Sequence, residues 1–194
     1  LKFLVEYFKS VRSDKIELII HDNSESSSIY DFESVIQSCN DSRIKYFYSL
    51  DELSVIENCD YAISKATGEY VAMIGDDDIF SKHIIEFTEK FKEEGIDAIL
   101  PIKSSYTWPD VKPRLYGDMM SGVYSIKNFN IRRTKIDVKK ELDNVLKLGG
   151  TQILDLPRVY HGIMKREILE NIYKETNSYF PGPSPDMANA IAAC

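Results

Sequence analysis

The clearest structural signal in the chain is the segment Ala66-Thr67-Gly68-Glu69-Tyr70-Val71-Ala72-Met73-Ile74-Gly75-Asp76-Asp77-Asp78-Ile79-Phe80. A short apolar run, residues 70–74, has the length of a buried strand and ends in three consecutive carboxylates. Adjacent acids repel one another, and strand chemistry does not require them. Hard divalent cations take oxygen ligands, often one or two carboxylates plus substrate phosphates. Because ligands of open α/β sheets bind outside the carboxyl ends of the strands, the stretch predicts a metal site.

The same acids also fit an acidic turn that leads into a helix. In that interpretation Asp78 or Ser81 is the N-cap, and the carboxylates lie at the positive end of the helix dipole. The order of strand and then acids, together with the other polar strand ends described below, favours the metal site over the cap.

The chain on either side of this stretch alternates between helical and strand patterns. Apolar residues recur at helical spacing in four segments, and continuous or alternating apolar runs indicate strands between them. The expected helices cover residues 1–11, 29–36, 55–66 and 84–91, and the expected strands cover 15–20, 44–48, 70–74 and 97–102. Gly95 is the expected C-cap of the fourth helix. The alternation predicts an α/β fold, with a mainly parallel central sheet and helices on both faces.

Composition bounds the class of protein. The 194 residues suit a single domain, residues 1–194, and 43% apolar residues allow a sizeable core. The formal net charge is −7 without an obvious basic block, which does not indicate a nucleic-acid or anionic-membrane partner. Three scattered cysteines form neither a disulfide framework nor a zinc pattern and fit a reducing compartment. No apolar run has membrane-spanning length, and no signal peptide is recognisable.

The second half of the chain is less regular. Residues 103–150 contain scattered Pro and Gly and a basic cluster within 130–140, which is more typical of a solvated face than of a phosphate site. A helix is expected over 138–146, ending at Gly149-Gly150, followed by a strand over 158–164 and a helix through 168–172. A rigid Pro- and Gly-rich loop, residues 179–185, then leads to Asp186 at the start of a last helix, where an N-cap is the simplest role.

The first predicted strand also ends in polar residues, His21-Asp22-Asn23-Ser24. A carboxylate at Asp22 can accept a hydrogen bond from a ring N–H such as that of uracil. An Asx turn into the next helix is an alternative role for Asp22, and the two roles are compatible.

These motifs resemble family 2 glycosyltransferases of the GT-A fold. In that family a helix closes with A-x-G-E-Y, as at residues 66–70, a strand follows, and a D-x-D-type motif holds a divalent metal against a nucleotide-sugar diphosphate. The resemblance implies a GT-A-type, Rossmann-like α/β fold from which the first strand of the family is missing. Since the chain opens inside an amphipathic pattern and closes on Ala192-Ala193-Cys194, we expect a fragment of a longer protein.

The resemblance also assigns roles to site residues. Asp78 is expected to be the first metal ligand, with Asp76 as a further candidate, for Mn²⁺ or Mg²⁺. Gly75 stands where the family often has its first aspartate, so Asp76 or Asp77 is expected on the ribose or on metal-bound water. Asp22 and Asn23 are expected at the nucleotide base. Asp60 stands in the helix that usually carries a diphosphate-binding arginine and is a candidate to contact the nucleotide. Asp186 stands where inverting members have their general base, with His161 a weaker acceptor-side candidate.

The implied activity is that of a hexosyltransferase-like enzyme that moves a sugar from a UDP-sugar donor to a saccharide or lipid-linked acceptor with inversion. Residues 1–102 would form the nucleotide-sugar half and 103–194 the acceptor half of a monomer or weak homodimer. Family analogy places such chains in polysaccharide or glycolipid assembly, in the cytoplasm at the inner face of a membrane. The alternatives are a non-catalytic sugar-nucleotide or metal-binding module, which the absent arginine favours, and another metal-dependent α/β enzyme, which rests on the acid cluster alone.

Overall fold

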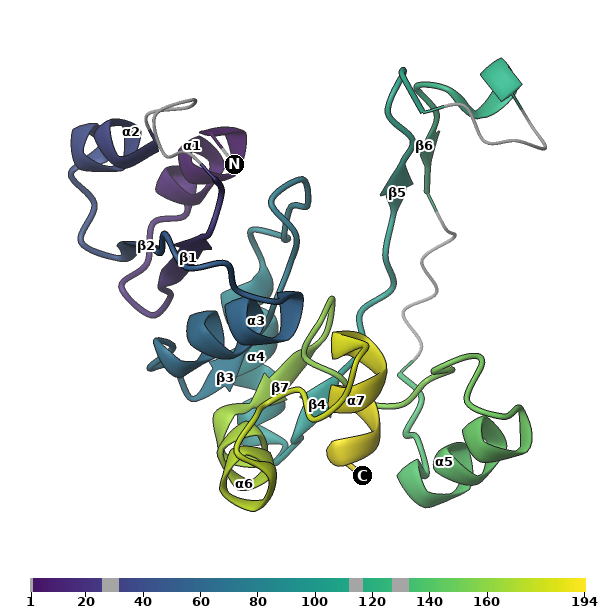
Figure 1. The fold of residues 1–194 in the computed structure, drawn as a ribbon. Coiled ribbons are helices and arrows are strands. Elements are labelled where there is room, and N and C mark those ends of the chain that lie inside the picture. The colour runs from purple at the N-terminus through teal and green to yellow at the C-terminus, as the bar shows by residue number, and fades with distance from the viewer. Residues whose placement is uncertain (1, 26–31, 112–116, 127–132) are drawn as a thin grey trace. The chain divides into compact units, whose positions relative to one another are not determined.

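The computed structural model describes residues 2–25, 32–111, 117–126 and 133–194. The chain divides into two compact units (Figure 1). We call Leu1–Leu100 with Asp137–Cys194 the sheet unit, and Pro101–Ile136 the hairpin unit. Leu1 and Ile29, which contributed to two predicted helices, lie outside the described residues.

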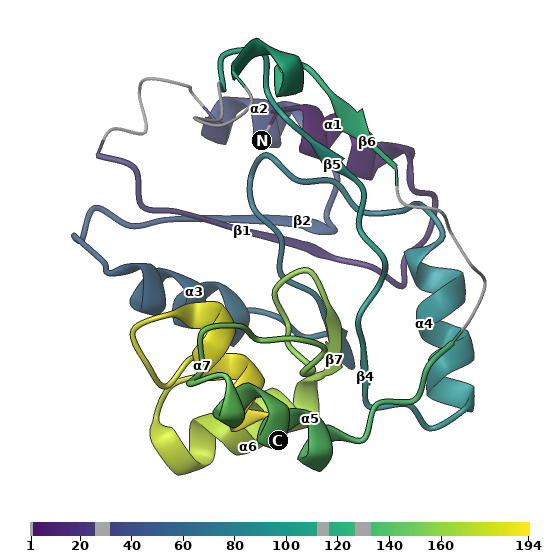
Figure 2. The same cartoon turned by 90° about the vertical axis from the view of Figure 1, so that its right-hand side faces the viewer.

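The sheet unit begins with a parallel strand pair. Strand β1 (Leu18–Asp22) pairs with β2 (Ile44–Tyr48), with Ile20 opposite Tyr46 (Figure 2). Side chains alternate between the two faces of a strand. Those of Ile20 and Ile44 therefore pack on one side, in a core with residues of helix α1 (Lys2–Ser10) and partly buried residues of helix α2 (Phe32–Cys39).

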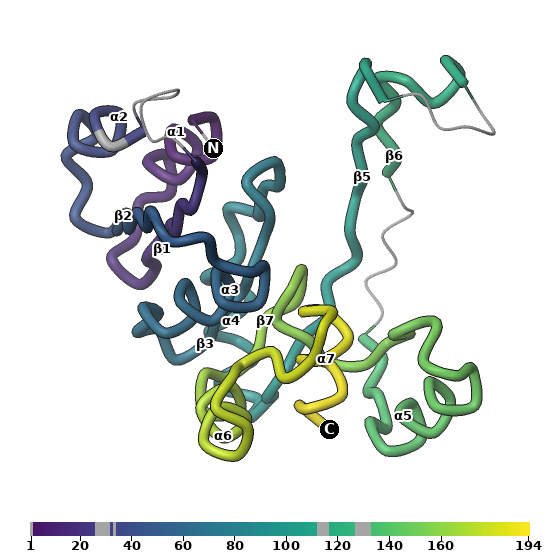
Figure 3. Tube along the Cα trace, in the orientation of Figure 1, coloured from purple at the N-terminus to yellow at the C-terminus, as the bar shows by residue number. Residues whose placement is uncertain are grey.

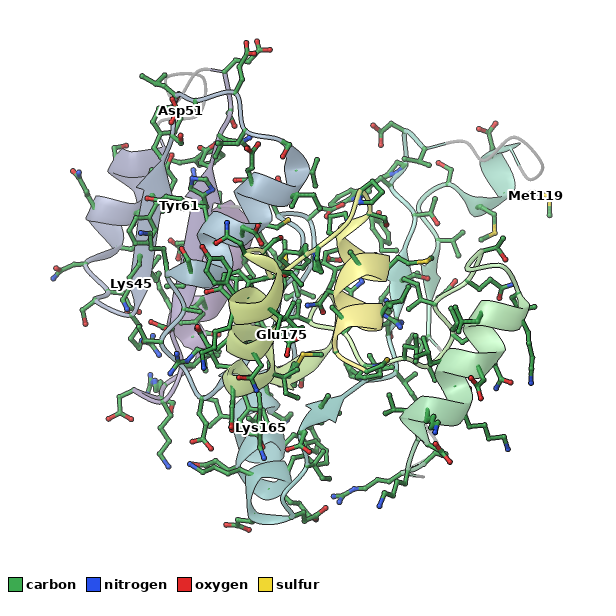
Figure 4. All side chains as sticks on the ribbon, turned by 60° about the horizontal axis from the view of Figure 1, so that its bottom comes forward. Lys45, Asp51, Tyr61, Met119, Lys165 and Glu175 are labelled. Atoms are coloured by element: carbon green, nitrogen blue, oxygen red, sulfur yellow. The ribbon has the colours of Figure 1, made fainter. Side chains whose placement is uncertain are left out.

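The opposite face of this strand pair is covered by helix α3 (Val55–Ser64). The His21 ring stacks on the Tyr61 ring with 4.1 Å between centroids, and Phe47 meets Tyr61 edge-on at 6.1 Å. Tyr61 is labelled in Figure 4. The prediction of helices on both faces of a parallel pair is thus confirmed for β1 and β2.

Three further strands form a second sheet with antiparallel pairings. Strand β7 (Ile163–Lys165) lies between β3 (Tyr70–Val71) and β4 (Ala98–Ile99) and runs opposite to both. The expected mainly parallel sheet is therefore shown only in part: β1 and β2 pair in parallel, whereas both pairings in this second sheet are antiparallel. The reason is that β7 is inserted from a distant part of the chain, and alternation of neighbouring helices and strands does not predict such an insertion.

The remaining helices complete the sheet unit. Helix α6 (Arg166–Thr176) follows β7 directly and buries Leu169, together with Met164 and Phe180, in a shared core. The other helices are α4 (Ile84–Glu93), α5 (Val138–Lys147) and α7 (Pro185–Ala192). None of the described helices combines the length and apolarity needed to cross a bilayer.

Two helix ends confirm the glycine stop signals. After α4, Gly95 has φ +69°, its N–H donates to the carbonyl of Lys92, and the N–H of Ile96 donates to the carbonyl of Phe91. This is the Schellman arrangement, which satisfies carbonyls that the helix leaves unpaired. Gly149 and Gly150 end α5 in the same way.

Several predicted boundaries differ from the structure. The expected strands over 15–20, 97–102 and 158–164 occur as the shorter or shifted β1, β4 and β7. Neither Asp78 nor Ser81 caps α4, because this helix begins at Ile84 after His83, which makes no side-chain capping bond. The Asp78 carboxylate instead makes hydrogen bonds with Gly75 and His161, which are described below.

The hairpin unit is built on one short antiparallel pair. Strand β5 (Ser105–Tyr106) pairs with β6 (Tyr124–Ser125), with Tyr106 opposite Tyr124 (Figure 3). A 3₁₀ turn, η2 (Gly117–Met120), lies between them in sequence. None of the described residues of this unit is buried.

Candidate functional site

The acid cluster forms a tight turn around Gly75. The Asp78 N–H donates to the Gly75 carbonyl at 3.2 Å, and the Gly75 N–H donates to Asp78 Oδ2 at 2.8 Å. A Cβ on Gly75 would lie 2.8 Å from Asp77 Oδ1 and 3.2 Å from Asp78 Oδ2. Gly75 therefore lets two carboxylates approach its backbone closely, at the position where the resembled family often has its first aspartate.

A second turn, Val159-Tyr160-His161-Gly162, is fixed to the end of the predicted 70–74 run. The Met73 N–H donates to the Val159 carbonyl at 3.0 Å, and the His161 N–H donates to the Met73 carbonyl at 2.8 Å. His161 has φ +55°, which is uncommon for a residue with a side chain. At Gly162 a Cβ would lie 2.1 Å from the carbonyl oxygen of Arg158, so this turn accepts only glycine there.

The two turns meet through the His161 and Asp78 side chains. His161 Nε2 lies 2.6 Å from Asp78 Oδ2, and the side chains are 24% and 33% exposed. An ionised carboxylate only accepts hydrogen bonds, so Nε2 is the donor when Asp78 is ionised. His161 therefore orients the carboxylate that the sequence placed first among the metal ligands.

The phenol of Tyr160 is influenced by acids from distant parts of the chain. Burial raises the pKa of its phenol, and the negative charges of Asp78, Asp186 and Asp77 raise the pKa further. The Tyr160 oxygen would lie 3.7 Å from a Cβ on Gly75. Its ring is also 4.0 Å from the His161 ring, centroid to centroid. The acid cluster and Asp186, more than a hundred residues apart in sequence, thus act on one phenol.

Helix α7 is tied to this turn by the buried side chain of Asn189. Its Oδ1 accepts from the Val159 N–H at 2.9 Å, and its Nδ2 donates to the Tyr179 carbonyl at 3.1 Å. Asp186 lies in the first turn of α7, after Ser184 at the N-cap and Pro185. The N-cap role considered for Asp186 is therefore wrong, and its carboxylate is not used for capping.

Asp22, at the end of β1, has both carboxylate oxygens engaged. Oδ1 accepts from the Ser24 N–H at 2.9 Å and from its hydroxyl at 2.6 Å, and Oδ2 accepts from the Tyr46 hydroxyl at 2.8 Å. Burial acts to raise the pKa of Asp22, but these hydrogen bonds outweigh it and hold the pKa below its ordinary value. The predicted Asx turn is confirmed. Asn23 Nδ2 donates to the Leu53 carbonyl at 3.4 Å, before α3.

Asp60 has a structural contact. Its Oδ1 accepts from the Tyr179 N–H at 2.8 Å, which links α3 to the loop before α7. Its neighbour Cys59 is buried; burial first, and then the charges of Asp60 and Asp186, raise the pKa of that thiol to about 11. Cys59 is therefore a protonated core residue at neutral pH.

The charges of Asp77, Asp78 and Asp186 all act on Tyr160, whereas the bonds described for Asp22, Asn23 and Asp60 are to other groups. Asp76 is exposed in the same turn. Within the described residues, no group of three or more His, Cys, Asp or Glu is placed to hold a metal. Two close carboxylates at Gly75 fit a Mg²⁺ or Mn²⁺ ion that takes its other ligands from phosphates and water.

Sequence reasoning missed Tyr160 and Asn189, and it ranked His161 low. Nothing in the spacing of these residues marks them, because their importance depends on the contact between Met73 and the 159–162 turn. The one local signal is Gly162 directly after a polar and aromatic pair, which is compatible with a close backbone approach.

Comparisons with known proteins agree with the motifs. The profile of the family described as Glycosyl transferase family 2 matches residues 1–152. An uncharacterized glycosyltransferase of Rickettsia conorii is 28% identical over 128 residues, which are 64% of this chain and 20% of that protein. The chain thus spans about a fifth of the length of this curated relative. His161 and Asp186 lie beyond the profile match.

Proposed function

Because the chain belongs to glycosyl transferase family 2, we propose that it is the part of an enzyme that transfers a sugar from a nucleoside-diphosphate donor to an acceptor hydroxyl. The observation that carries this proposal is the carboxylate turn at Gly75, where His161 holds Asp78 next to Tyr160, whose pKa the charges of Asp78, Asp186 and Asp77 raise. In this proposal the donor-side acids Asp77 and Asp78 and the candidate base Asp186 serve one reaction centre, because sugar transfer needs both a donor site and a base. The R. conorii relative, named a glycosyltransferase, supports the same activity.

On the donor side, Asp78 would be the first metal ligand, with Asp76 and Asp77 nearby to hold the ribose or metal-bound water. A divalent cation such as Mn²⁺ or Mg²⁺ supplies charge neutralisation for the departing diphosphate when bound. His161 holds one Asp78 oxygen at 2.6 Å and so limits the orientations of this carboxylate. Tyr160, whose raised pKa keeps its phenol protonated at neutral pH, can donate a hydrogen bond to an oxygen of the donor.

The nucleotide base would lie at the end of β1. Asp22 is kept ionised by its lowered pKa, and Asn23 is beside it, so both present acceptor groups suited to the uracil of a UDP-sugar. In this proposal, residues 1–102 form the donor half of the enzyme and residues 103–194 form the acceptor half. Asp60, bound to the Tyr179 amide, would contribute by fixing the loop before α7 rather than by touching the nucleotide.

On the acceptor side, Asp186 would take the proton of the attacking hydroxyl as general base. A single base without a second enzymic nucleophile implies inversion at the anomeric carbon. Asn189 holds α7 against the 159–162 turn and thereby sets the position of this base. The acceptor would be a saccharide or a lipid-linked saccharide, and a cytoplasmic location at the inner face of a membrane fits such an acceptor.

A non-catalytic sugar-nucleotide module is the second candidate. It is favoured by Asp60, an acid at the place where the family often carries a diphosphate-binding arginine. This candidate predicts metal-dependent nucleotide binding without transfer to any acceptor.

Calorimetric titration of UDP, with Mn²⁺ or with a chelator, tests the donor site. We expect metal-dependent binding that Asp78→Asn abolishes and that the exposed control Asp143→Asn, which removes the same charge, leaves unchanged. Release of UDP from a panel of UDP-sugars with saccharide acceptors then tests transfer. Asp186→Asn should lower turnover by about 10²–10⁴-fold, as loss of a general base does, without changing UDP affinity.

Three results would contradict parts of this proposal. Equal UDP binding in wild type and Asp78→Asn would remove Asp78 from the metal site. Retention of anomeric configuration in the product would remove Asp186 as the base of a single displacement. Binding without turnover across the panel would favour the non-catalytic module.

A further inference from the structure

Charge is distributed very unevenly between the two units. Residues 101–136 carry seven of the 24 Lys and Arg of the chain and two of its 31 Asp and Glu, so this segment is net +5. The rest of the chain, with 17 basic and 29 acidic residues, is net −12. The whole-chain charge of −7, which did not indicate an anionic partner, therefore conceals a basic segment.

The short β-hairpin of this segment has an aromatic face. Tyr106 of β5 lies directly opposite Tyr124 of β6, and side chains two positions apart in a strand share a face. The Thr107 N–H donates to the Val123 carbonyl at 2.9 Å, which continues the ladder toward Trp108. The Trp108 ring meets the Tyr106 ring edge-on at 5.3 Å. The other face carries Ser105, Thr107 and Ser125.

Most of the described apolar side chains of the hairpin unit are strongly exposed. Met119 is 82% exposed (Figure 4), and Tyr124 and Ile126 are each 61% exposed. The other exposed large apolar residues of the unit are Ile102, Tyr106, Trp108 and Val111. A two-stranded hairpin without a core is marginally stable in water, and none of the described residues of this unit is buried. Exposed apolar residues gathered in this way mark an interaction surface.

We propose that the hairpin unit is an interfacial anchor that binds the surface of an anionic lipid bilayer. Trp and Tyr are favoured at the boundary between acyl chains and headgroups, and Met and Ile add apolar surface for insertion. Basic residues are attracted by anionic headgroups. The described cations Lys103, Arg133 and Lys135 are exposed. Aliphatic side chains beside the aromatic ones favour a lipid surface over a nucleic acid, which uses stacking and phosphate contacts.

Trp108 is the only tryptophan of the chain, so its fluorescence reports on this surface directly. The chain is mixed with vesicles of phosphatidylcholine alone, or of equal parts phosphatidylcholine and phosphatidylglycerol. We expect a blue shift of the emission and reduced acrylamide quenching with the mixed vesicles, weakened by high salt. Absence of both changes with mixed vesicles would overturn the proposal, and so would the same changes with single-stranded DNA in place of lipid.

Matched variants separate the apolar and basic contributions, and Trp108 remains as the reporter. Tyr124→Ser with Ile126→Ser should weaken vesicle affinity by at least about tenfold, because it removes inserted apolar surface. The control pair is Phe3→Ser with Leu50→Ser, which are similarly exposed in the sheet unit and should leave affinity unchanged. Lys103→Glu with Lys135→Glu should also weaken vesicle affinity by about tenfold or more. The control pair Lys147→Glu with Lys174→Glu should leave vesicle affinity unchanged.

Vesicle binding is independent of the proposed sugar transfer. Asp78→Asn should lose metal-dependent UDP binding and keep the Trp108 shift, whereas the hairpin variants should keep UDP binding and lose the shift. Equal vesicle affinity of all hairpin variants and their controls would overturn the anchor and leave the proposed transferase unaffected.

Discussion

The sheet unit and the hairpin unit differ in how far their apolar side chains are buried. In the sheet unit, buried apolar residues form three clusters, and polar groups at strand ends bond to one another, as His161 does to Asp78. In the hairpin unit, the described residues form no buried cluster, and its large apolar side chains face solvent. The contacts within the sheet unit are therefore enough to explain how it folds. The hairpin unit instead exposes apolar side chains that a partner could cover.

This difference bears on how each unit tolerates change. In the sheet unit, the positions of Tyr160, His161 and Asp78 depend on close backbone contacts, so small additions to the side chains there should be costly. In the hairpin unit, side chains have space, so substitutions should alter binding more than folding. Three substitutions test this contrast.

The largest effect is expected from Gly162→Ala in the turn that carries Tyr160 and His161. Its Cβ would lie 2.1 Å from the Arg158 carbonyl oxygen and 3.1 Å from that of Ile99, both backbone atoms that do not move easily. We expect the free energy of unfolding to fall by more than about 3 kcal/mol, measured by urea denaturation followed by circular dichroism.

Gly122→Ala in the hairpin unit is the matched control. Gly122 has φ +69°, and a Cβ there would meet only Pro109 Cγ, at 4.0 Å. The cost should therefore be that of the left-handed conformation alone, about 1 kcal/mol. Similar losses at both glycines would show that the close contact at Gly162 does not constrain the turn.

Much of the sheet unit could be predicted from sequence because its signals are local. Strand β2 was predicted at its observed bounds, and the glycines after α4 and α5 marked both helix ends. Polar residues were expected at the carboxyl ends of β1 and of the 70–74 run. Asp22 is the last residue of β1, whereas β3 ends at Val71 and Asp78 follows seven residues later, in the turn around Gly75. In each case, the residues that cause the structural feature are close together in the sequence.

The features that could not be predicted depend on contacts between residues that are far apart in the sequence. The antiparallel insertion of β7 between β3 and β4, the bond of His161 to Asp78, and the role of Asn189 all join segments that are far apart in sequence. The basic cluster within 130–140 was recognised from the sequence and interpreted as a solvated face, but its place in one unit with the exposed aromatic strand pair follows only from the structure.

A smaller effect is expected from acid, through Glu17 in the sheet unit. Glu17 Oε1 accepts from the Thr67 N–H at 2.6 Å and the Gly68 N–H at 3.1 Å, and Oε2 accepts from Lys45 Nζ at 2.7 Å. Burial acts to raise its pKa, but these bonds outweigh burial and lower the pKa below 4.5. A carboxyl with a lowered folded-state pKa stabilises the fold above pH 4.5, and this contribution is lost as pH falls through the folded pKa.

Glu17→Gln should therefore lower the free energy of unfolding at neutral pH by about 1–2 kcal/mol, the scale of a charge-assisted hydrogen bond. The loss should shrink as the pH is lowered below 4.5, because wild-type Glu17 is then also neutral. Glu175→Gln, at an exposed glutamate (Figure 4), is the control and should change little at either pH. A pH-independent difference for Glu17→Gln would show that its charge does not stabilise the fold.

The smallest effect is expected at Met119 in the hairpin unit. Because its side chain is 82% exposed, Met119→Ser removes almost no buried apolar surface and should change the free energy of unfolding by no more than about 0.5 kcal/mol. Leu50→Ser, at an 81% exposed position of the sheet unit, should behave alike in urea. The two variants should differ only with anionic vesicles, where the proposed anchor makes Met119 contribute to binding and Leu50 not. A loss of stability above about 1 kcal/mol for Met119→Ser alone would show that this methionine is part of a folded core, and the contrast between the two units would then fail at its most exposed residue.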